Sequence, residues 1–134
     1  KISVEIKSAT CTRVGTYPDE ATKSQKPTFQ FRASGSAHGG SSDARLKFRF
    51  SPGVLAPWDY SCGAWRNELK SWAYDCARDQ AGEDMDWAYS IKGAVYYYEL
   101  ARANTDSINF TASVFLENSP DVGRVSRNVI VKCQ

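Results

Sequence analysis

The chain has 134 residues, with 17 Lys or Arg against 15 Asp or Glu and a formal net charge of +2. One domain spanning residues 1–134 is long enough to bury a hydrophobic core. Charges of both signs are mixed along the chain, which argues against a nucleic-acid surface or a polybasic membrane surface. No apolar run reaches the ~18 residues of a membrane-spanning helix.

Alternation of apolar and polar residues dominates the chain and predicts half-buried antiparallel strands. The residues expected to share a buried face are Ile2, Val4 and Ile6; Phe29, Phe31 and Ala33; Leu46, Phe48 and Phe50; Tyr96, Tyr98 and Leu100; Ile108, Phe110, Ala112, Val114 and Leu116; and Val129, Val131 and Cys133. Turns are expected at 17–19, 34–42, 51–53, 104–106 and 118–123. The pattern predicts a mainly β, single-domain antiparallel β-sandwich or flattened barrel.

A pattern of Trp, Tyr and then Cys or Ile recurs in the middle of the chain, at 58–62, 72–76 and 87–91. Alternate residues of a strand share a face, so each repeat would place its Trp and Tyr on one side. Large aromatic residues at alternating positions are usually buried, and we expect Trp58, Trp72 and Trp87 to lie in the core. If they faced solvent instead, the row of rings would form a stacking platform for sugars. Trp65 lies outside the repeat and is the tryptophan expected to be exposed.

A helix competes with the strand interpretation near residues 64–78. Helical spacing relates the apolar residues of this segment, and Gly82 follows as a stop signal. The apolar residues concerned are Trp65, Leu69, Trp72, Ala73 and Cys76. A helix here would make the fold α+β.

Four cysteines without a C-x-x-C pair indicate disulfides rather than a zinc site. Of the three pairings, the nested one matches the repeat, because Cys62 and Cys76 end neighbouring repeats and would bond to each other. Cys11 would then bond to Cys133, and the fold would be cross-linked twice. Disulfides persist in oxidising compartments, so we expect a secreted, extracellular protein.

Two weaker features agree with secretion. The chain begins at Lys1 rather than at Met, as a processed product or a trimmed chain would. Residues 109–111 form an N-glycosylation sequon in a predicted strand, with Asn109 on the face opposite Ile108 and Phe110.

The sequence offers no constellation for catalysis. His38 is the only histidine, and we expect a solvated loop around it that cannot hold and aim an imidazole. Clustered carboxylates near Gly82 could bind calcium or form a glycosidase pair, but a solvated turn is the expected structure. These residues are Asp79, Glu83, Asp84 and Asp86. We therefore expect no enzyme, no metal and no cofactor; a small hydrolase that uses Asp84 and Asp86 is a third function class.

The segment Trp58-Asp-Tyr60-Ser-Cys62-Gly63, which follows the alternating residues 46–50, resembles the segment around one disulfide of the Alternaria major-allergen family. That family comprises small, secreted, two-disulfide fungal β-barrels and includes elicitors of plant defence. A Cys11–Cys133 bridge is not that family's second bridge. In style the chain is similar to small secreted fungal effectors.

These observations predict a non-enzymatic, monomeric, secreted recognition protein. The resemblance implies a fungal effector or elicitor whose partner is a host protein or a cell-surface ligand. The alternative is a carbohydrate-binding module in which Trp65 and Trp87 are exposed and contact the sugar.

Overall fold

The computed structural model describes residues 1–51, 64–66, 71–73, 76–90, 95–119 and 123–134, with backbone only for 64–66, 71–73, 76–82, 95–96 and 98–99. The described elements are β1 (Ser3–Asp19), β2 (Ser24–His38), β3 (Leu46–Ser51), β4 (Ala64–Arg66), β5 (Ser71–Ala73), β6 (Cys76–Gly82), β7 (Met85–Ser90), β8 (Val95–Tyr96), α1 (Tyr97–Arg102), β9 (Ser107–Leu116) and β10 (Val125–Lys132).

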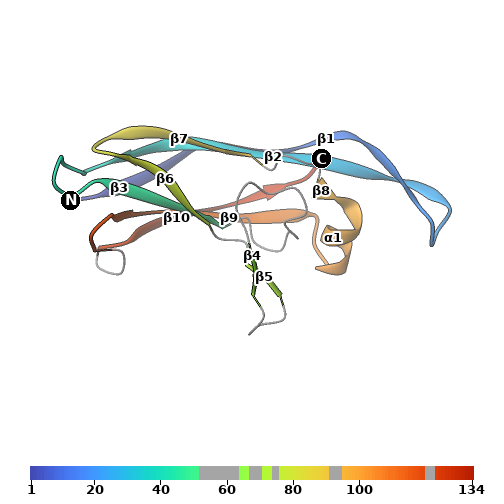
Figure 1. Ribbon diagram of the computed structural model, residues 1–134. Coiled ribbons are helices and arrows are strands. Elements are labelled where there is room, and N and C mark those ends of the chain that lie inside the picture. Colours follow the sequence, from blue (N-terminus) through green and yellow to red (C-terminus); the bar gives the residue numbers. More distant parts are fainter. Residues whose placement is uncertain (52–63, 67–70, 74–75, 91–94, 120–122) are drawn as a thin grey trace.

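Two antiparallel sheets lie face to face and converge toward the C-terminus (Figure 1). One sheet has the order β1–β2–β7, with β8 also paired to β2, and the other has the order β10–β9–β3–β6. Strands β4 and β5 form a separate two-stranded sheet. The predicted mainly β architecture is confirmed, and its form is an open sandwich rather than a closed barrel.

The core lies between the two sheets and is built from the predicted alternating faces. Residues at alternate positions of β2, β3 and β9 are buried, as the sequence pattern predicts: Phe29, Phe31 and Ala33; Leu46, Phe48 and Phe50; Ile108, Phe110, Ala112 and Val114. Aromatic rings join the sheets across this core. The Phe50 ring lies 5.1 Å from Trp87 and 5.5 Å from Tyr89, and Phe31 lies 5.0 Å from Phe110, centroid to centroid.

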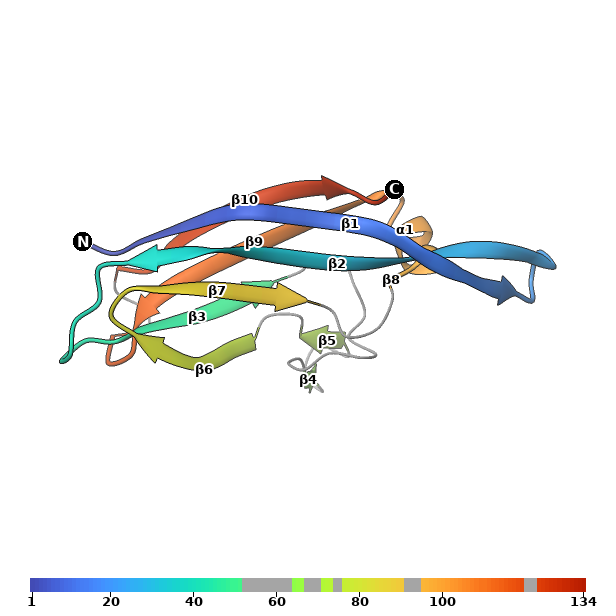
Figure 2. The same cartoon turned by 90° about the horizontal axis from the view of Figure 1, so that it is seen from above.

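The β1–β2 hairpin projects beyond the rest of the sandwich as a twisted two-stranded ribbon (Figure 2). The turn predicted at 17–19 is wrong, because β1 continues to Asp19 and the chain reverses at 20–23. Pro18 is compatible with this strand because β1 lies at the edge of its sheet, where a missing N–H costs no ladder bond. The ribbon is solvent-facing along part of its length, with Val14 56 % exposed.

Segment 34–42 is only partly the loop that its Gly and Ser content predicts. Strand β2 runs through it to His38, and Gly35 pairs with Trp87 of β7. A Cβ at position 35 would lie 1.8 Å from the Glu5 carbonyl oxygen and 2.6 Å from the Trp87 ring. Glycine is therefore required here by the close approach of β1 and the indole, and not by a turn.

The helix proposed for 64–78 is wrong, because its described residues belong to β4, β5 and β6. The second aromatic repeat is also not one strand: Trp72 lies in β5, which pairs with β4, whereas Cys76 begins β6, which pairs with β3. Local patterns cannot show this, since β6 pairs with β3, which lies far from it in the sequence, whereas β5 pairs with the nearby β4.

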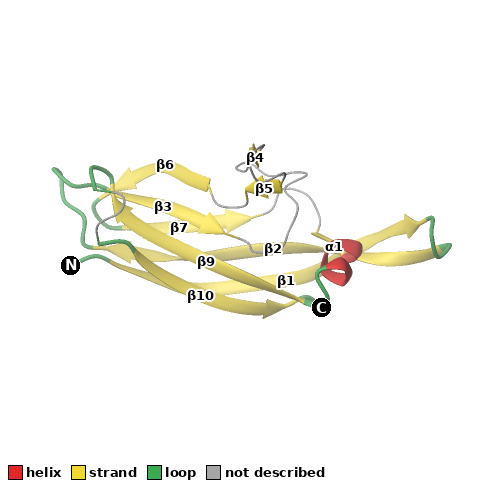
Figure 3. Cartoon of the chain, turned by 90° about the horizontal axis from the view of Figure 1, so that it is seen from below, coloured by secondary structure: helices red, strands yellow, loops and turns green. Residues whose placement is uncertain are grey.

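Helix α1 replaces the strand predicted at 96–100, and Figure 3 shows it beside the C-terminal end of the chain. The composition of 97–102 favours a helix, and Leu100 is buried against the core. The helix ends at Arg102. Asn104 lies in the turn that follows, where its φ is +56° and its N–H donates to the Ala101 carbonyl at 3.0 Å.

Candidate functional site

The predicted Cys11–Cys133 disulfide is present and joins the edges of the two sheets. The two Cα atoms lie 4.6 Å apart, and the residues form a parallel β-bridge. Around the bridge, Arg13 N–H donates to the Gln134 carbonyl at 3.3 Å, and Gln134 N–H donates to the Cys11 carbonyl at 3.1 Å. The bridge therefore closes the sandwich at one end of the β1/β10 junction. Cys62 lies outside the described residues, so the Cys62–Cys76 pairing stays a prediction.

A groove continues from this junction between β1 and β10. It consists of two hollows of about 540 and 410 Å³, and Val129 lines both. We call it the β1/β10 groove; its lining residues are Glu5, Ile6, Lys7, Ala9, Thr10, Cys11 and Thr12 of β1, and Arg127 to Lys132 with Gln134 of the C-terminal segment. The main-chain bonds that join β1 to the C-terminal segment, among the described residues, are the two at the disulfide.

The groove has an apolar floor. Ile6 and Ala9 from one sheet and Val129 and Val131 from the other are partly buried and pack against the hydrophobic core. Strand β10 runs beside β1 (Figure 2), but among the described residues main-chain hydrogen bonds join β1 to the C-terminal segment at Cys11, Arg13 and Gln134 only, and the shallow hollows follow the seam from there. Ile130 points to the opposite face of β10 and is 68 % exposed. The other outward positions of β10 are polar: Ser126, Asn128 and Lys132.

The rim of the groove is mainly basic. Lys7 and Arg127 line one hollow, and Lys132 lines the other. Lys132 also lies 3.6 Å from an Asp106 carboxylate oxygen, in an exposed pair that contributes little to stability. The one acidic residue in the lining, Glu5, accepts a hydrogen bond from the Ser36 hydroxyl at 3.3 Å.

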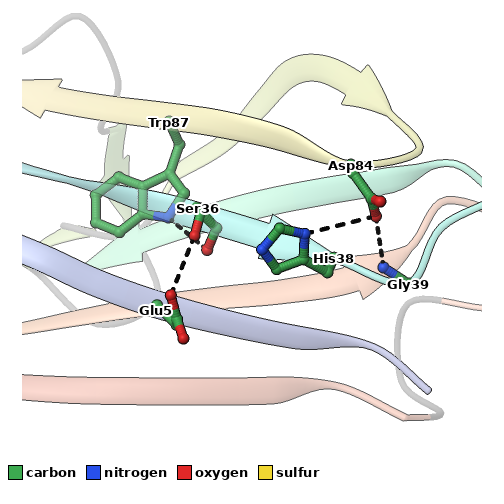
Figure 4. Close-up of polar contacts among 6 residues, drawn as sticks. All are labelled: Glu5, Ser36, His38, Gly39, Asp84 and Trp87. Carbon is green, nitrogen blue, oxygen red and sulfur yellow. Dashed lines mark hydrogen bonds and ion pairs between the residues drawn. The ribbon is translucent and has the colours of Figure 1, made fainter.

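A polar network crosses the same sheet and joins β1, β2 and β7 (Figure 4). The Trp87 indole N–H donates to the Ser36 carbonyl at 3.3 Å, while the ring itself packs over Gly35. The Ser36 hydroxyl points to Glu5, as described above. These contacts fix the indole in the core, where Trp87 is only 3 % exposed.

His38 and Asp84 meet at the end of this network (Figure 4). The Gly39 N–H donates to Asp84 Oδ1 at 2.8 Å, and His38 Nδ1 lies 3.9 Å from the same oxygen. Glu83 is exposed beside Asp84, and its carbonyl accepts from the Gly40 N–H at 2.9 Å. The arrangement holds the β6–β7 turn against the end of β2.

Of the acidic residues near Gly82, Glu83 and Asp84 lie in the predicted turn, whereas Asp79 lies in β6 and Asp86 in β7. The His38 and Asp84 side chains are both more than half exposed, and the Ser36 hydroxyl is directed at Glu5 instead of at the imidazole. Within the described part of the chain, no three His, Cys, Asp or Glu side chains are grouped so as to hold a metal ion. The contacts of Asp84 hold the β6–β7 turn against Gly39 at the end of β2.

Trp87 does not fit its proposed role as an exposed sugar-binding residue, because its ring lies in the core. The sequence pattern itself favoured the buried position, and Tyr89 of the same repeat is buried beside it. The backbone of Trp65 lies in β4, and its side chain is outside the described part of the structure. A role for Trp65 in ligand binding therefore stays a prediction.

Asn109 lies in β9 on the exposed face predicted for it, opposite the buried Ile108 and Phe110. The Asn128 amide of β10 donates to the Asn109 side-chain oxygen and, at 2.9 Å, to the Thr111 hydroxyl. Asn109, the residue that would carry a glycan, is thus exposed on the surface of the sheet. Its glycosylation stays a prediction.

The sequence predicted strand faces for the groove residues but did not predict the groove itself. The alternation placed Ile6, Val129 and Val131 on buried sides, but it does not say which strands end the sheets. One feature of the sequence does point to the groove. Residues 129–131 are apolar at three successive positions, so a strand with only one buried face would leave one of these side chains exposed.

Comparison of the chain with protein-family models, curated proteins and solved structures gave no match. The resemblance to the Alternaria allergen family stays a prediction from the sequence. The described helix is too short to cross a membrane.

Proposed function

We propose that this protein is a secreted, non-enzymatic recognition protein that binds another polypeptide through the β1/β10 groove. The observation that carries the proposal is the groove's apolar floor between two sheet edges. Water contact with Ile6, Ala9, Val129 and Val131 is unfavourable by roughly 25 cal/mol per Å² of apolar surface, so a partner that covers them is stabilised.

Secretion is supported by the Cys11–Cys133 bridge, because such bonds are stable in oxidising compartments. The bridge also matters for binding. It holds the two walls of the groove together at one end, so the binding surface is pre-organised and a partner loses less entropy on association.

A host protein is the partner class that the resemblance to fungal effectors favours. The carbohydrate-binding alternative has weaker support, because Trp87 is buried and its remaining aromatic candidate is Trp65. The two classes differ in the ligand that must be found and in the residues on which binding depends.

The test is to present the purified, disulfide-bonded protein to an array of extracellular proteins and to a glycan array. Each hit is repeated with Ala9→Arg, which places a long charged side chain on the groove floor, and with Thr22→Arg, the same residue introduced at the exposed hairpin turn. We expect protein hits that Ala9→Arg removes and Thr22→Arg retains. Glycan hits that depend on Trp65, or protein hits that both variants retain, would contradict the proposal.

A further inference from the structure

The one N-glycosylation sequon of the chain, Asn109-Phe110-Thr111, lies in β9. Strand β9 pairs with β10, and Figure 3 shows the two strands side by side. Phe110 is buried in the core, whereas Asn109 is exposed and Thr111 is half-buried on the outer face of the sheet. The acceptor amide and the hydroxyl of the sequon are therefore on the same outer face, because alternate residues of a strand share a side.

Asn128 of β10 sets the orientation of the Asn109 side chain. The Asn128 amide nitrogen donates to the Phe110 carbonyl at 3.2 Å, to the Thr111 hydroxyl at 2.9 Å, and to the Asn109 side-chain oxygen. Because a carbonyl can only accept, it is the nitrogen of Asn128 that is directed at these groups, and Asn109 presents its oxygen to it. Glycosylation of the Asn109 nitrogen leaves that oxygen intact, so this contact and a glycan are compatible.

An exposed apolar side chain lies directly opposite the sequon. Ile130 is paired with Asn109 across the β9–β10 ladder and is 68 % exposed, whereas the other outward positions of β10 are polar. Directly opposite residues of an antiparallel pair have Cβ atoms about 4.5–5.5 Å apart, so a sugar on the Asn109 nitrogen reaches Ile130. The C–H face of a pyranose ring that packs on this side chain would remove apolar surface from water.

We propose that Asn109 carries an N-linked glycan whose first sugar, an N-acetylglucosamine, packs on Ile130. The proposal rests on the secretion in the proposed function and is independent of the groove. The donor is a lipid-diphosphate-linked oligosaccharide of the secretory pathway. The Asn109 nitrogen attacks C1 of the first sugar, and the C1–N bond forms as the bond from C1 to the phosphate oxygen breaks. The lipid diphosphate leaves with the bonding electron pair, and the nitrogen loses one proton to solvent.

The sheet also determines when the transfer takes place. Thr111 is paired with Asn128 of β10 on one side and with Ser51 of β3 on the other, and its hydroxyl accepts the bond from Asn128. A transferase has to hold the backbone and the hydroxyl of the sequon, and in the folded sheet both are engaged. We therefore expect the glycan to be added to the extended chain before β9 is paired.

The test of the modification is to secrete the full chain from eukaryotic cells and to measure its intact mass before and after treatment with peptide-N-glycosidase. Asn109→Gln removes the acceptor and Thr111→Ala removes the hydroxyl, whereas Asn118→Gln replaces another exposed asparagine that lies outside any sequon. We expect a glycan on the wild type and on Asn118→Gln, and none on the other two variants. An unmodified wild-type chain in the medium, or a glycan that remains on Asn109→Gln, would overturn the proposal.

The contact with Ile130 is tested separately. The unglycosylated reference is the same chain made in a bacterial periplasm, which is oxidising, in a host that lacks the transferase. We expect the glycan to raise the melting temperature of the wild type by about 3 °C, and the first sugar to give nuclear Overhauser effects to the Ile130 methyl groups. In Ile130→Ser the gain should fall below about 1 °C. Equal gains in both chains, or no contact between the sugar and these methyl groups, would refute the packing.

Failure of this inference can be distinguished from failure of the proposed function. A chain that reaches the medium with the Cys11–Cys133 bridge closed but without a glycan refutes only the glycosylation. A glycosylated chain that gives no protein hits dependent on Ala9 refutes only the binding function, since Ala9→Arg leaves the sequon unchanged. A chain that the cells retain with reduced cysteines contradicts secretion, and with it both proposals.

Discussion

The packing of Gly35 makes the sharpest stability prediction for this protein. In Gly35→Ala, the added Cβ would stand 1.8 Å from the Glu5 carbonyl oxygen, about 1.6 Å short of the 3.4 Å at which ordinary contacts begin. It would also stand 2.6 Å and 2.8 Å from two carbons of the Trp87 ring. Since the nearest atom belongs to the backbone, no change of rotamer relieves the overlap.

The cost follows from what must move. Separating β1 from β2 at this point weakens neighbouring ladder hydrogen bonds, each of net value about 1 kcal/mol, and displacing a packed ring by overpacking costs roughly 1–3 kcal/mol. We expect Gly35→Ala to lower the free energy of unfolding by about 4 kcal/mol. That is a large fraction of the roughly 5–15 kcal/mol typical of native proteins.

Gly15→Ala is the matched control, in the same hairpin. A Cβ at position 15 meets the Thr28 hydroxyl at 3.5 Å, which is ordinary contact. We expect a change within about 0.5 kcal/mol, or a small gain, because alanine reduces the entropy of the unfolded chain. Urea unfolding of both variants, followed by tryptophan fluorescence and circular dichroism, measures the difference. Equal stabilities of the two variants would refute the packing argument.

Three further substitutions test the contacts that hold the sandwich and its turns. The Cys11→Ser/Cys133→Ser double variant, which opens a loop across a separation of 122 residues, should lose about 4–5 kcal/mol in urea unfolding; a loss no greater than that of a surface double variant would contradict this. Asp84→Ala should lower the free energy of unfolding by about 1 kcal/mol and speed hydrogen exchange of the Gly39 amide. Asp84→Asn keeps an acceptor oxygen and should therefore keep most of the protection of that amide against exchange. Equal exchange rates in the two variants would show that the Asp84 side chain does not hold the loop. Trp87→Phe removes the indole N–H bond and part of the core contact, so calorimetry should show a loss of about 2 kcal/mol, and an unchanged melting temperature would place the ring outside the core.

The choice of β strands along most of the chain was already contained in the sequence. Runs such as 46–50 and 108–114 alternate so regularly that burying one face requires an extended chain, and the structure buries the predicted side chains. The pairing of Cys11 with Cys133 could also be predicted from the sequence, since four cysteines allow only three pairings. The candidate His38 and Asp84 could be named, but not their mutual distance.

Other features depended on contacts between distant segments. Gly35 is read locally as a turn residue, yet its role comes from Glu5 and Trp87, which approach it from neighbouring strands. Of the strand predicted at 96–100, only Tyr96 pairs with β2, as part of β8. The helix begins at the next residue and still buries Leu100 against the core.

The β1/β10 groove is the clearest case of what tertiary structure alone decided. Alternation in β10 specifies two faces of a strand, but a strand has the same pattern whether it lies inside a sheet or at its edge. Only the strand order places β10 and β1 at the ends of facing sheets, where the Cys11–Cys133 bond holds them side by side. The sequence determined which side chains could be apolar and inward, because that depends on the two-residue period of the backbone. The order of the strands, which arises from pairing over long sequence separations, determined which of those side chains stay partly exposed.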